Sequence, residues 1–548
     1  MKRRILPTGT IICGTAAVEQ IGHELSLRGI RRVRAVCDKS MLGKTARLLS
    51  RMEPDPGTEI LIASSDEELP QESDGLILMG TLPVPEQQRH SFVLKIPFTL
   101  EDLSPRMSGV DMLVLDRRLF QQQSTLEPFF RELYRETLRE ESSYPFPLRF
   151  PAAFQFSADT ELIWGDETLQ ELDLLLKRDG VRAPMLITDK GITAAGLIET
   201  LLDTLDAGLD VVVRDKVPPD SDHRLVDGLA VDFREYRRDA LIAIGGGSVL
   251  DTAKGISISL GLSGKKILAL EGSNILPPPD IPLYMVPTTS GTGSESTKVA
   301  VIADHQEKRK RLFVSPFLQP RAAVLDSSLT LSLPPHLSSI TGMDAVSHAI
   351  EAFTCLGKNP LSDMMAWRAL ELLSAHLEQA AAFPDRIVHR RGLALASTLA
   401  GRAFSNSMVG MVHSIGHAVG GVCGASHGAC MAVLLPHALE FNGEIIADSL
   451  EELLIPLTNR ENYEHTAAVA RPEAVIQRIR ELNSSLREIT GGRHPNRLRE
   501  ILGKEGVPLI KPVDFAAIAE AALGDASLMY NPKELDRGDI LQILQDAW

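Results

Sequence analysis

Two histidine-bearing motifs constrain this 548-residue chain more than any other feature of its sequence. Asp344 and His348 stand four residues apart, as do His413 and His417, a spacing that places each pair on one face of a helix. A glycine-rich segment then lets the chain turn back before His427. Three imidazoles and one carboxylate suit a divalent metal with open coordination positions. A lone histidine is usually a hydrogen-bonded core residue, but this grouping predicts a catalytic metal site.

The composition limits the classes of partner. A net charge of -15 argues against nucleic acid and against an anionic membrane surface. No apolar run approaches the roughly 20 residues that span a bilayer, and the N-terminus lacks the apolar stretch of a secretory signal. Five cysteines without a C-x-x-C pair suit a reducing cytosol. Cys423 and Cys430 flank His427, and we interpret them as small buried thiols rather than thiolate ligands. We expect a cytoplasmic protein.

The distribution of apolar patterns predicts three domains, since the chain is too long for one. In residues 1-150, short apolar runs alternate with helical patterns, and a proline-rich stretch at 144-151 marks a boundary. Strand patterns continue to residue 333, and helical patterns follow at 340-354, 360-382, 390-405, 413-422 and 434-441. We therefore predict an α/β domain over 1-150, a second α/β domain over 151-333 and an all-helical domain over 334-548.

The two α/β segments resemble each other in sequence, which indicates an internal duplication. Four blocks match in order, at separations that grow from 151 to 210 residues: 11-14 with 162-165, 74-80 with 239-245, 96-99 with 286-289, and 114-116 with 324-326. Chance similarity between α/β segments is the alternative. The growing separations are what loop deletions from the first copy would leave.

The second copy carries a glycine turn between an apolar strand and a helix, formed by Gly245, Gly246, Gly247 and Ser248, with Asp251 in the helix. Glycines admit a pyrophosphate close to the backbone, and the helix N-terminus offers free N–H groups. The first copy has Leu82 and Pro83 in the equivalent loop, so we expect residues 1-150 to be a degenerate, non-catalytic copy. Asp189 ends an earlier strand, where it can bind a ribose hydroxyl or cap a helix.

The motifs around the histidines resemble the iron-containing (type III) alcohol dehydrogenases. The resemblance rests on Gly342-Met-Asp344-x-x-x-His348-Ala-Ile-Glu351, Val412-His413-x-x-x-His417-x-x-Gly420-Gly421, His427-Gly428 and Leu435-Pro436-His437, and it covers about residues 154-548. It implies an α/β dinucleotide-binding domain followed by an all-α metal-binding domain, the dehydroquinate synthase-like fold. It assigns the metal to Asp344, His348, His413 and His427. His417 becomes a non-ligand residue near nicotinamide and substrate, a candidate for proton relay or for simple helix packing.

The resemblance also extends the set of candidate cofactor residues. The segment 287-295, with Thr288, Thr289, Thr292 and Gly293, is similar to the family's hydroxyl-rich second nucleotide loop. Lys310 matches a family lysine near the cofactor, although it also fits a solvated lysine in the basic run 308-311. Asp189 stands where the family selects between NAD and NADP, and a carboxylate there favours NAD.

The resemblance thus implies a metal-dependent oxidoreductase that transfers a hydride between NAD(H) and a small alcohol or aldehyde. We expect Fe²⁺ as the metal, with Zn²⁺ as the alternative, and a homo-oligomer, a dimer or larger. Two other functions stay open. A cyclising lyase of the dehydroquinate synthase type would need a Lys/Arg-rich phosphate pocket, which the helical half does not show near its histidines. A non-enzymatic scaffold fits residues 1-150 but not an intact ligand set.

Overall fold

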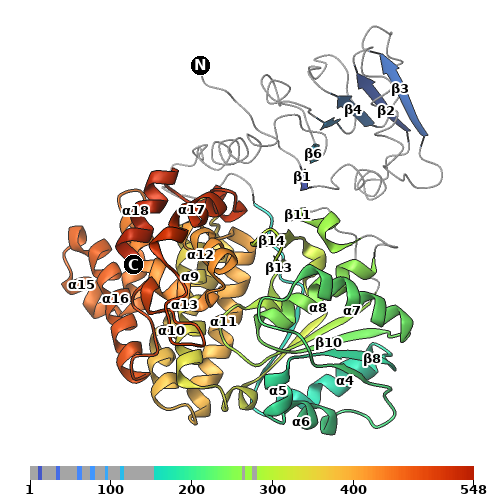
Figure 1. Cartoon of the computed structure of the whole chain (residues 1–548), viewed down its shortest axis with the longest axis horizontal. Helices are drawn as coiled ribbons and strands as arrows, with labels where there is room; N and C mark the ends of the chain where they lie inside the picture. Colours follow the sequence, from blue (N-terminus) through green and yellow to red (C-terminus); the bar gives the residue numbers. More distant parts are fainter. Residues whose placement is uncertain are drawn as a thin grey trace. The chain divides into compact units, whose positions relative to one another are not determined.

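The computed structural model describes residues 154–261, 266–273 and 281–548, together with six strands within the first 153 residues (Figure 1). Those strands form a parallel sheet in the order β3-β2-β4-β5-β6-β1. Their bounds are β1 (Thr10–Gly14), β2 (Arg32–Cys37), β3 (Glu59–Ser64), β4 (Gly75–Met79), β5 (Val93–Ile96) and β6 (Met112–Asp116). The loop with Leu82 and Pro83 and the linker at 144-151 lie outside the described residues.

A second parallel sheet follows, in the order β9-β8-β10-β12-β15-β7. Every residue of β10, β12 and β15 is buried, as expected for central parallel strands covered on both faces. The bounds are β7 (Glu161–Gly165), β8 (Pro184–Ile187), β9 (Val212–Arg214), β10 (Ala240–Gly245), β12 (Leu283–Pro287) and β15 (Ala322–Asp326). Three more strands are β11 (Gly272–Ser273), β13 (Val299–Asp304) and β14 (Arg309–Val314).

Helices cover both faces of the second sheet. In Figure 1, α4, α5 and α6 lie on one side of it, and α7 and α8 lie on the other. Leucines of α4 and α6 pack with alternate residues of the strands, including Ile242 and Ile244, in one apolar cluster. The bounds are α4 (Glu171–Arg178), α5 (Lys190–Ala194), α6 (Leu197–Thr204), α7 (His223–Glu235) and α8 (Gly247–Leu260).

The chain from residue 335 onward is helical. Local signals explain the helix starts: Pro335 opens α9, and Asn359 and Ser362 form a capping box at the start of α10. The helices are α9 (Pro335–Thr354), α10 (Pro360–Ala382), α11 (Ile387–Ser407), α12 (Met411–Cys423), α13 (His427–Asn442), α14 (Ala447–Leu457), α15 (Arg460–His465), α16 (Arg471–Ile489), α17 (Phe515–Leu523) and α18 (Arg537–Ala547). Within the described part of the chain, no helix combines the length and the apolar character needed to cross a bilayer.

The predicted fold class is confirmed: a parallel α/β sheet precedes an all-helical part. The predicted helix 360-382 matches α10 at both ends, while α13 begins at His427, seven residues before its predicted start. The residue boundaries of the three domains remain a prediction.

Candidate metal centre and cofactor pocket

Three helices bring the predicted metal ligands together. Asp344 and His348 lie on α9, His413 lies on α12, and His427 is the first residue of α13. The Asp344 Oδ1 atom lies 3.8 Å from His413 Nε2, 3.4 Å from His427 Nε2 and 3.9 Å from His348 Nδ1. The three imidazoles therefore converge on one oxygen of the Asp344 carboxylate.

Glycines permit this convergence. Gly424 ends α12 with a φ of 68°, a left-handed conformation that reverses the chain before α13. A Cβ on Gly428 would lie 2.5 Å from the carbonyl oxygen of Ile340 in α9. Only glycine thus lets the start of α13, and with it His427, approach α9 so closely.

Buried polar atoms at this centre lack partners within the described residues. Asp344 Oδ1, His348 Nδ1 and His413 Nε2 are shielded from solvent and make no hydrogen bond there. A buried polar group without a partner is costly, roughly 1–3 kcal/mol each. Asp344, His348 and His413 each offer a ligand atom within 4.8 Å of the others, so a cation among them would satisfy all three. This donor set fits a divalent metal.

The charge states of these groups also suit metal binding. Burial lowers the pKa of His348 and of His427 well below the ordinary value, so both imidazoles are neutral. Burial raises the pKa of Asp344 to about 6. Ligand histidines must be neutral and ligand carboxylates ionised, so a bound cation would favour the ionised form of Asp344.

Glu351 supports one of the ligands. This buried carboxylate on α9 pairs through Oε2 with His413 Nδ1 and accepts a hydrogen bond from the Val412 amide, with an N–O distance of 2.8 Å. Burial alone would lower the pKa of His413, but the Glu351 carboxylate holds that pKa above its ordinary value. A proton held on Nδ1 leaves Nε2 facing Asp344 with its lone pair available.

His417 lies beside the ligands. Its Nδ1 lies 2.9 Å from Asp525 Oδ2, and its ring stacks on His427 with centroids 5.2 Å apart. Burial alone would raise the pKa of Asp525, but the partnership with His417 holds that pKa below its ordinary value. Asp525 therefore fixes the orientation of the His417 ring, with Nε2 as its free nitrogen.

A cavity of about 140 Å³ connects the histidines to the glycine turn. All the predicted histidines line it, and Gly247, Ser248, Asp251, Thr292 and Lys310 line it as well. Lys310 donates to Asp220 at 2.9 Å, and its stem lies against Gly420 of α12. The paired lysine therefore stands between the turn and the histidines, not in open solvent.

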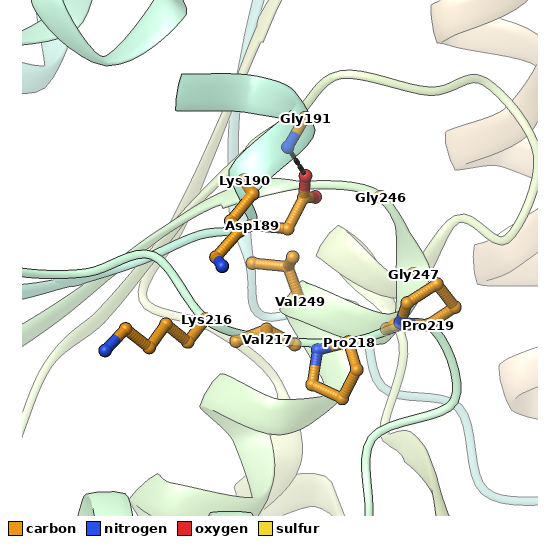
Figure 2. Close-up of a pocket in the computed structure, with 11 residues that line it drawn as sticks. Asp189, Lys190, Gly191, Lys216, Val217, Pro218, Pro219, Gly246, Gly247 and Val249 are labelled. Carbon is orange, nitrogen blue, oxygen red and sulfur yellow. Dashed lines mark hydrogen bonds between the residues drawn. The ribbon is translucent and has the colours of Figure 1, made fainter. Parts of the chain in front are cut away.

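A larger cavity of about 640 Å³ also borders the glycine turn. Figure 2 shows Asp189 and the Gly246–Gly247 turn lining this same pocket. Asp189 Oδ1 caps α5 by accepting from the amides of Gly191 and Ile192, at 2.7 and 3.0 Å. Asp189 thus caps a helix and also borders the pocket. Gly247 and Ser248 line both cavities, so the two spaces adjoin at the turn.

The second predicted loop packs beneath the glycine turn. A Cβ on Gly247 would lie 2.7 Å from Thr292, and one on Gly246 would lie 3.4 Å from Thr289. Asp251 accepts from Ser294 Oγ at 2.6 Å, which ties α8 to this loop. Four of the predicted cofactor residues line neither of these two cavities: Gly245, Thr288, Thr289 and Gly293.

Gly293 joins the loop to the helical part. Its φ is 62°, and a Cβ there would lie 2.6 Å from the Gly401 Cα of α11. Two residues later, Glu295 accepts from the Thr398 hydroxyl of α11 at 2.6 Å.

The two cysteines that flank His427 were predicted to be small buried thiols. Cys430 is buried and Cys423 half-buried, and burial raises their pKa values to about 12 and 11.

Glu351 and Asp525 contact His413 and His417, but neither was among the site residues predicted from the sequence. Glu351 follows Asp344 by seven residues on one helix, a spacing that could have placed it on the same face. Asp525 lies 108 residues from His417 and carries no such signal.

Comparisons with known proteins cover the part of the chain that forms these sites. The family described as "Iron-containing alcohol dehydrogenase" matches residues 159–327, and "Fe-containing alcohol dehydrogenase family, C-terminal" matches residues 338–548. The NAD-dependent methanol dehydrogenase of Bacillus methanolicus is 34% identical over 385 residues, which cover 70% of this chain and 97% of the relative.

A second relative and a solved structure show the same similarity. The 1,3-propanediol dehydrogenase of Citrobacter freundii is 35% identical over 373 residues, 67% of this chain and 92% of the relative. Among solved structures, the alcohol dehydrogenase from Oenococcus oeni superposes with a TM-score of 0.67 at 30% identity, over 72% of this chain and 100% of that one.

Proposed function

Because the chain belongs to the family of iron-containing alcohol dehydrogenases, which use NAD(H) and iron, we propose that Asp344, His348, His413 and His427 together hold its metal. The observation that carries this proposal is the set of buried ligand atoms of Asp344, His348 and His413, which face one another and make no hydrogen bond within the described part of the chain. His427 supports a fourth coordination position, since its Nε2 lies 3.4 Å from Asp344 Oδ1. Its side chain is 23% exposed, toward the cavity, which leaves an open side for substrate.

The same proposal places NAD(H) across the glycine turn. Asp189 would border the adenosine end in the larger pocket, and the amides of Gly246, Gly247 and Ser248 would hold the pyrophosphate at the start of α8. The smaller cavity, which shares Gly247 and Ser248 with the larger one, would take the nicotinamide end. Asp251 and Thr289 act indirectly, because they hold the turn and the second loop in position.

The chemistry divides between the bound groups and the side chains. When bound, the metal would supply Lewis-acid stabilisation of a substrate oxygen, and NAD(H) would supply the hydride chemistry. His417 holds or releases a proton at Nε2, while Asp525 keeps the opposite nitrogen protonated and the ring oriented. Phe404 and Val409 line the cavity with apolar surface that excludes water from the reacting atoms.

The substrate is a small alcohol or the corresponding aldehyde. The relatives' names specify methanol and 1,3-propanediol, and the cavity beside the histidines measures about 140 Å³. A phosphorylated substrate of the dehydroquinate synthase type would require several cations. Among the described residues that line this cavity, Lys310 is the only lysine or arginine, and Asp220 neutralises it.

Histidine removal tests the metal assignment. His348→Ala and His427→Ala should each abolish metal binding and turnover while leaving the fold intact, because three remaining ligands close the site poorly. Metal content after anaerobic purification with Fe²⁺, a panel of aldehydes with NADH, and circular dichroism are the measurements. His437→Ala is the matched control, since His437 is half-buried on α13, outside the ligand set. Full metal content and activity in either ligand variant would disprove the assignment.

We further propose that residues 1-150 are a duplicated nucleotide-binding domain that has lost its nucleotide site. The equivalent strand order in the two parallel sheets supports this proposal. The pairing register agrees as well: Ile11 with Leu113 as Leu162 with Ala323, and Leu76 with Val93 as Leu241 with Leu283. These pairs are related by the same sequence separations as the repeat.

Separating the two parts tests the second proposal. A chain beginning at Phe150 should keep its metal and NAD(H) binding, because the two family matches cover residues 159–327 and 338–548, and about 70% of the chain suffices to cover relatives over nearly their full length. Residues 1-150 alone should bind no NAD(H) in calorimetry. Micromolar binding by that fragment would show a working nucleotide site instead of a relic. A homo-oligomeric state and a cytoplasmic location remain predictions.

A further inference from the structure

The turn between α11 and α12 contains a residue in a conformation normally reserved for glycine. Met408 follows the last residue of α11 with a φ of 73° and a ψ of -172°. An L-amino acid with a side chain rarely adopts this combination, because its Cβ collides with the neighbouring backbone. Such strain persists only where the surroundings impose it, and it concentrates at functional positions.

Contacts with neighbouring segments hold the backbone of this turn in the strained conformation. The Met408 amide donates to the Phe404 carbonyl at 2.6 Å, and the Met408 carbonyl accepts from Cys355 Sγ at 3.5 Å. Gly357 approaches from the end of α9 so closely that a Cβ on it would lie 2.2 Å from the Ser407 carbonyl oxygen.

The far side of the turn is equally fixed. Asn531 accepts from the Met411 amide at 3.1 Å, and its side chain lies 2.7 Å from where a Cβ of Gly410 would stand. The backbone on both sides of Met408 therefore has little freedom to relax.

The strained residue lines the cavity that contains the histidines. Met408 shares this lining with Phe404 and Val409, its neighbours along the chain, while Val299, Val301 and Leu312 add apolar surface from β13 and β14. Phe404 cannot swing away, since it stacks on His348 with ring centroids 4.2 Å apart and an interplanar angle of 14°. Val409 is short, branched and buried. Among these three neighbours along the chain, Met408 has the long, flexible side chain, and its removal leaves the stacking of Phe404 on His348 in place.

We propose that Met408 determines substrate length, limiting the site to short-chain alcohols and their aldehydes. This inference rests on the function proposed above and adds the substrate class. The strained backbone holds Met408 in the lining of this cavity, so its thioether side chain would limit the length of the substrate's carbon chain. A glycine at this position would relieve the strain but would leave the cavity open at that end.

Two substitutions separate the two parts of this inference. Met408→Ala removes the side chain but keeps the Cβ, so it widens the cavity and leaves the strain. Met408→Gly removes the whole side chain, so it widens the cavity and also relieves the strain. With each variant as iron-loaded full-length enzyme, kcat/KM is measured with NADH and the linear aldehydes from acetaldehyde to hexanal. The ratio of hexanal to acetaldehyde should rise on the order of 10-fold or more in both variants, since a methylene in an apolar pocket changes selectivity on that scale.

Melting temperature supplies a readout that does not depend on activity. Met408→Gly should melt at a higher temperature than Met408→Ala, because only the glycine variant loses the Cβ that strains the backbone. The matched control is Met364→Ala, since Met364 is 62% exposed on α10 and does not line the cavity. That variant should leave the preference for chain length unchanged.

The outcomes distinguish the inference from the function beneath it. A wild-type enzyme that reduces acetaldehyde, with variants of unchanged length preference, would overturn the role of Met408 and leave the proposed function standing. A wild-type protein inactive toward every aldehyde would overturn the proposed function and the inference together. A glycine variant no more stable than the alanine variant would refute the account of strain, even if the length preference changed.

Discussion

The contact between Glu351 and His413 gives a quantitative test of how the metal centre is supported. In Glu351→Gln, the side-chain oxygen can still accept from the Val412 amide, at 2.8 Å in the wild type. The amide nitrogen then faces His413 Nδ1, which needs an acceptor for its proton. To resolve this clash of donors, the imidazole must move its proton to Nε2, the atom that faces Asp344.

The expected magnitude follows from the role of such outer contacts. Loss of the partner that orients a ligand histidine lowers metal affinity by about 10–100-fold, roughly 1.4–2.7 kcal/mol. The substitution is nearly isosteric, so the fold should survive. The assay is competition for Fe²⁺ or Zn²⁺ against a chelator of known affinity, at constant pH, with metal retained by the protein measured after separation.

The control removes a carboxylate elsewhere. Glu440→Gln lies on the half-exposed face of α13, where Glu440 pairs with Arg480 at the surface. This variant should bind metal like the wild type. An unchanged metal affinity in Glu351→Gln, with the fold intact by circular dichroism, would refute the idea that Glu351 selects the tautomer of His413.

Three further predictions follow from other residues. Asp189→Gly should raise kcat/KM with NADPH relative to NADH, because the carboxylate repels a 2′-phosphate. Asp189→Asn removes the charge but can still cap the helix, and an unchanged NADPH/NADH ratio in both variants would mean that Asp189 serves only as a helix cap. Asp525→Asn should lower kcat about 10-fold or more and alter the pH–rate profile without loss of metal, because His417 loses its orienting carboxylate. An unchanged pH–rate profile would mean that Asp525 and His417 have only a structural role. Burial lowers the pKa of Lys298 to about 8, below the unfolded value near 10.4, so the folded state carries a penalty that is complete below pH 8 and fades as the pH rises toward 10.4. Lys298→Met should therefore stabilise the protein on the order of 1–3 kcal/mol at pH 7 and much less at pH 10 in denaturant titrations, and an equal effect at both pH values would contradict this account.

The parts of the site that could be predicted are those in which the functional residues lie close together in the sequence. Asp344 and His348, one helical turn apart, and His413 on a second apolar helix were identifiable without any structure. The glycine turn after β10 was equally visible, because a parallel strand, glycines and a helix start follow one another directly. In each case a few neighbouring residues determine the local geometry.

Other parts left no local signal. The start of α13 was predicted too late because residues 428–436 are buried on every side, so the segment shows no amphipathic period. Asp525 reaches His417 through the packing of the C-terminal segment, across 108 positions. Met408 stands where local rules call for glycine, and only the surrounding backbone contacts account for its conformation.

The close approach of Gly293 to Gly401 would couple the binding of cofactor to the binding of substrate. α11 carries Gly401 in contact with the proposed nucleotide loop at 287-295, and one turn later it carries Phe404 in the cavity wall. With backbone against backbone there is no flexible side chain to absorb a displacement, so ordering of the loop by NAD(H) should also restrict the wall that contacts the substrate. Affinity for one ligand then depends on occupancy by the other, and by reciprocity the factor is the same in both directions. The enzyme would thus bind cofactor and substrate as a cooperative pair, with the coupling passing through two glycines that lack any chemistry of their own.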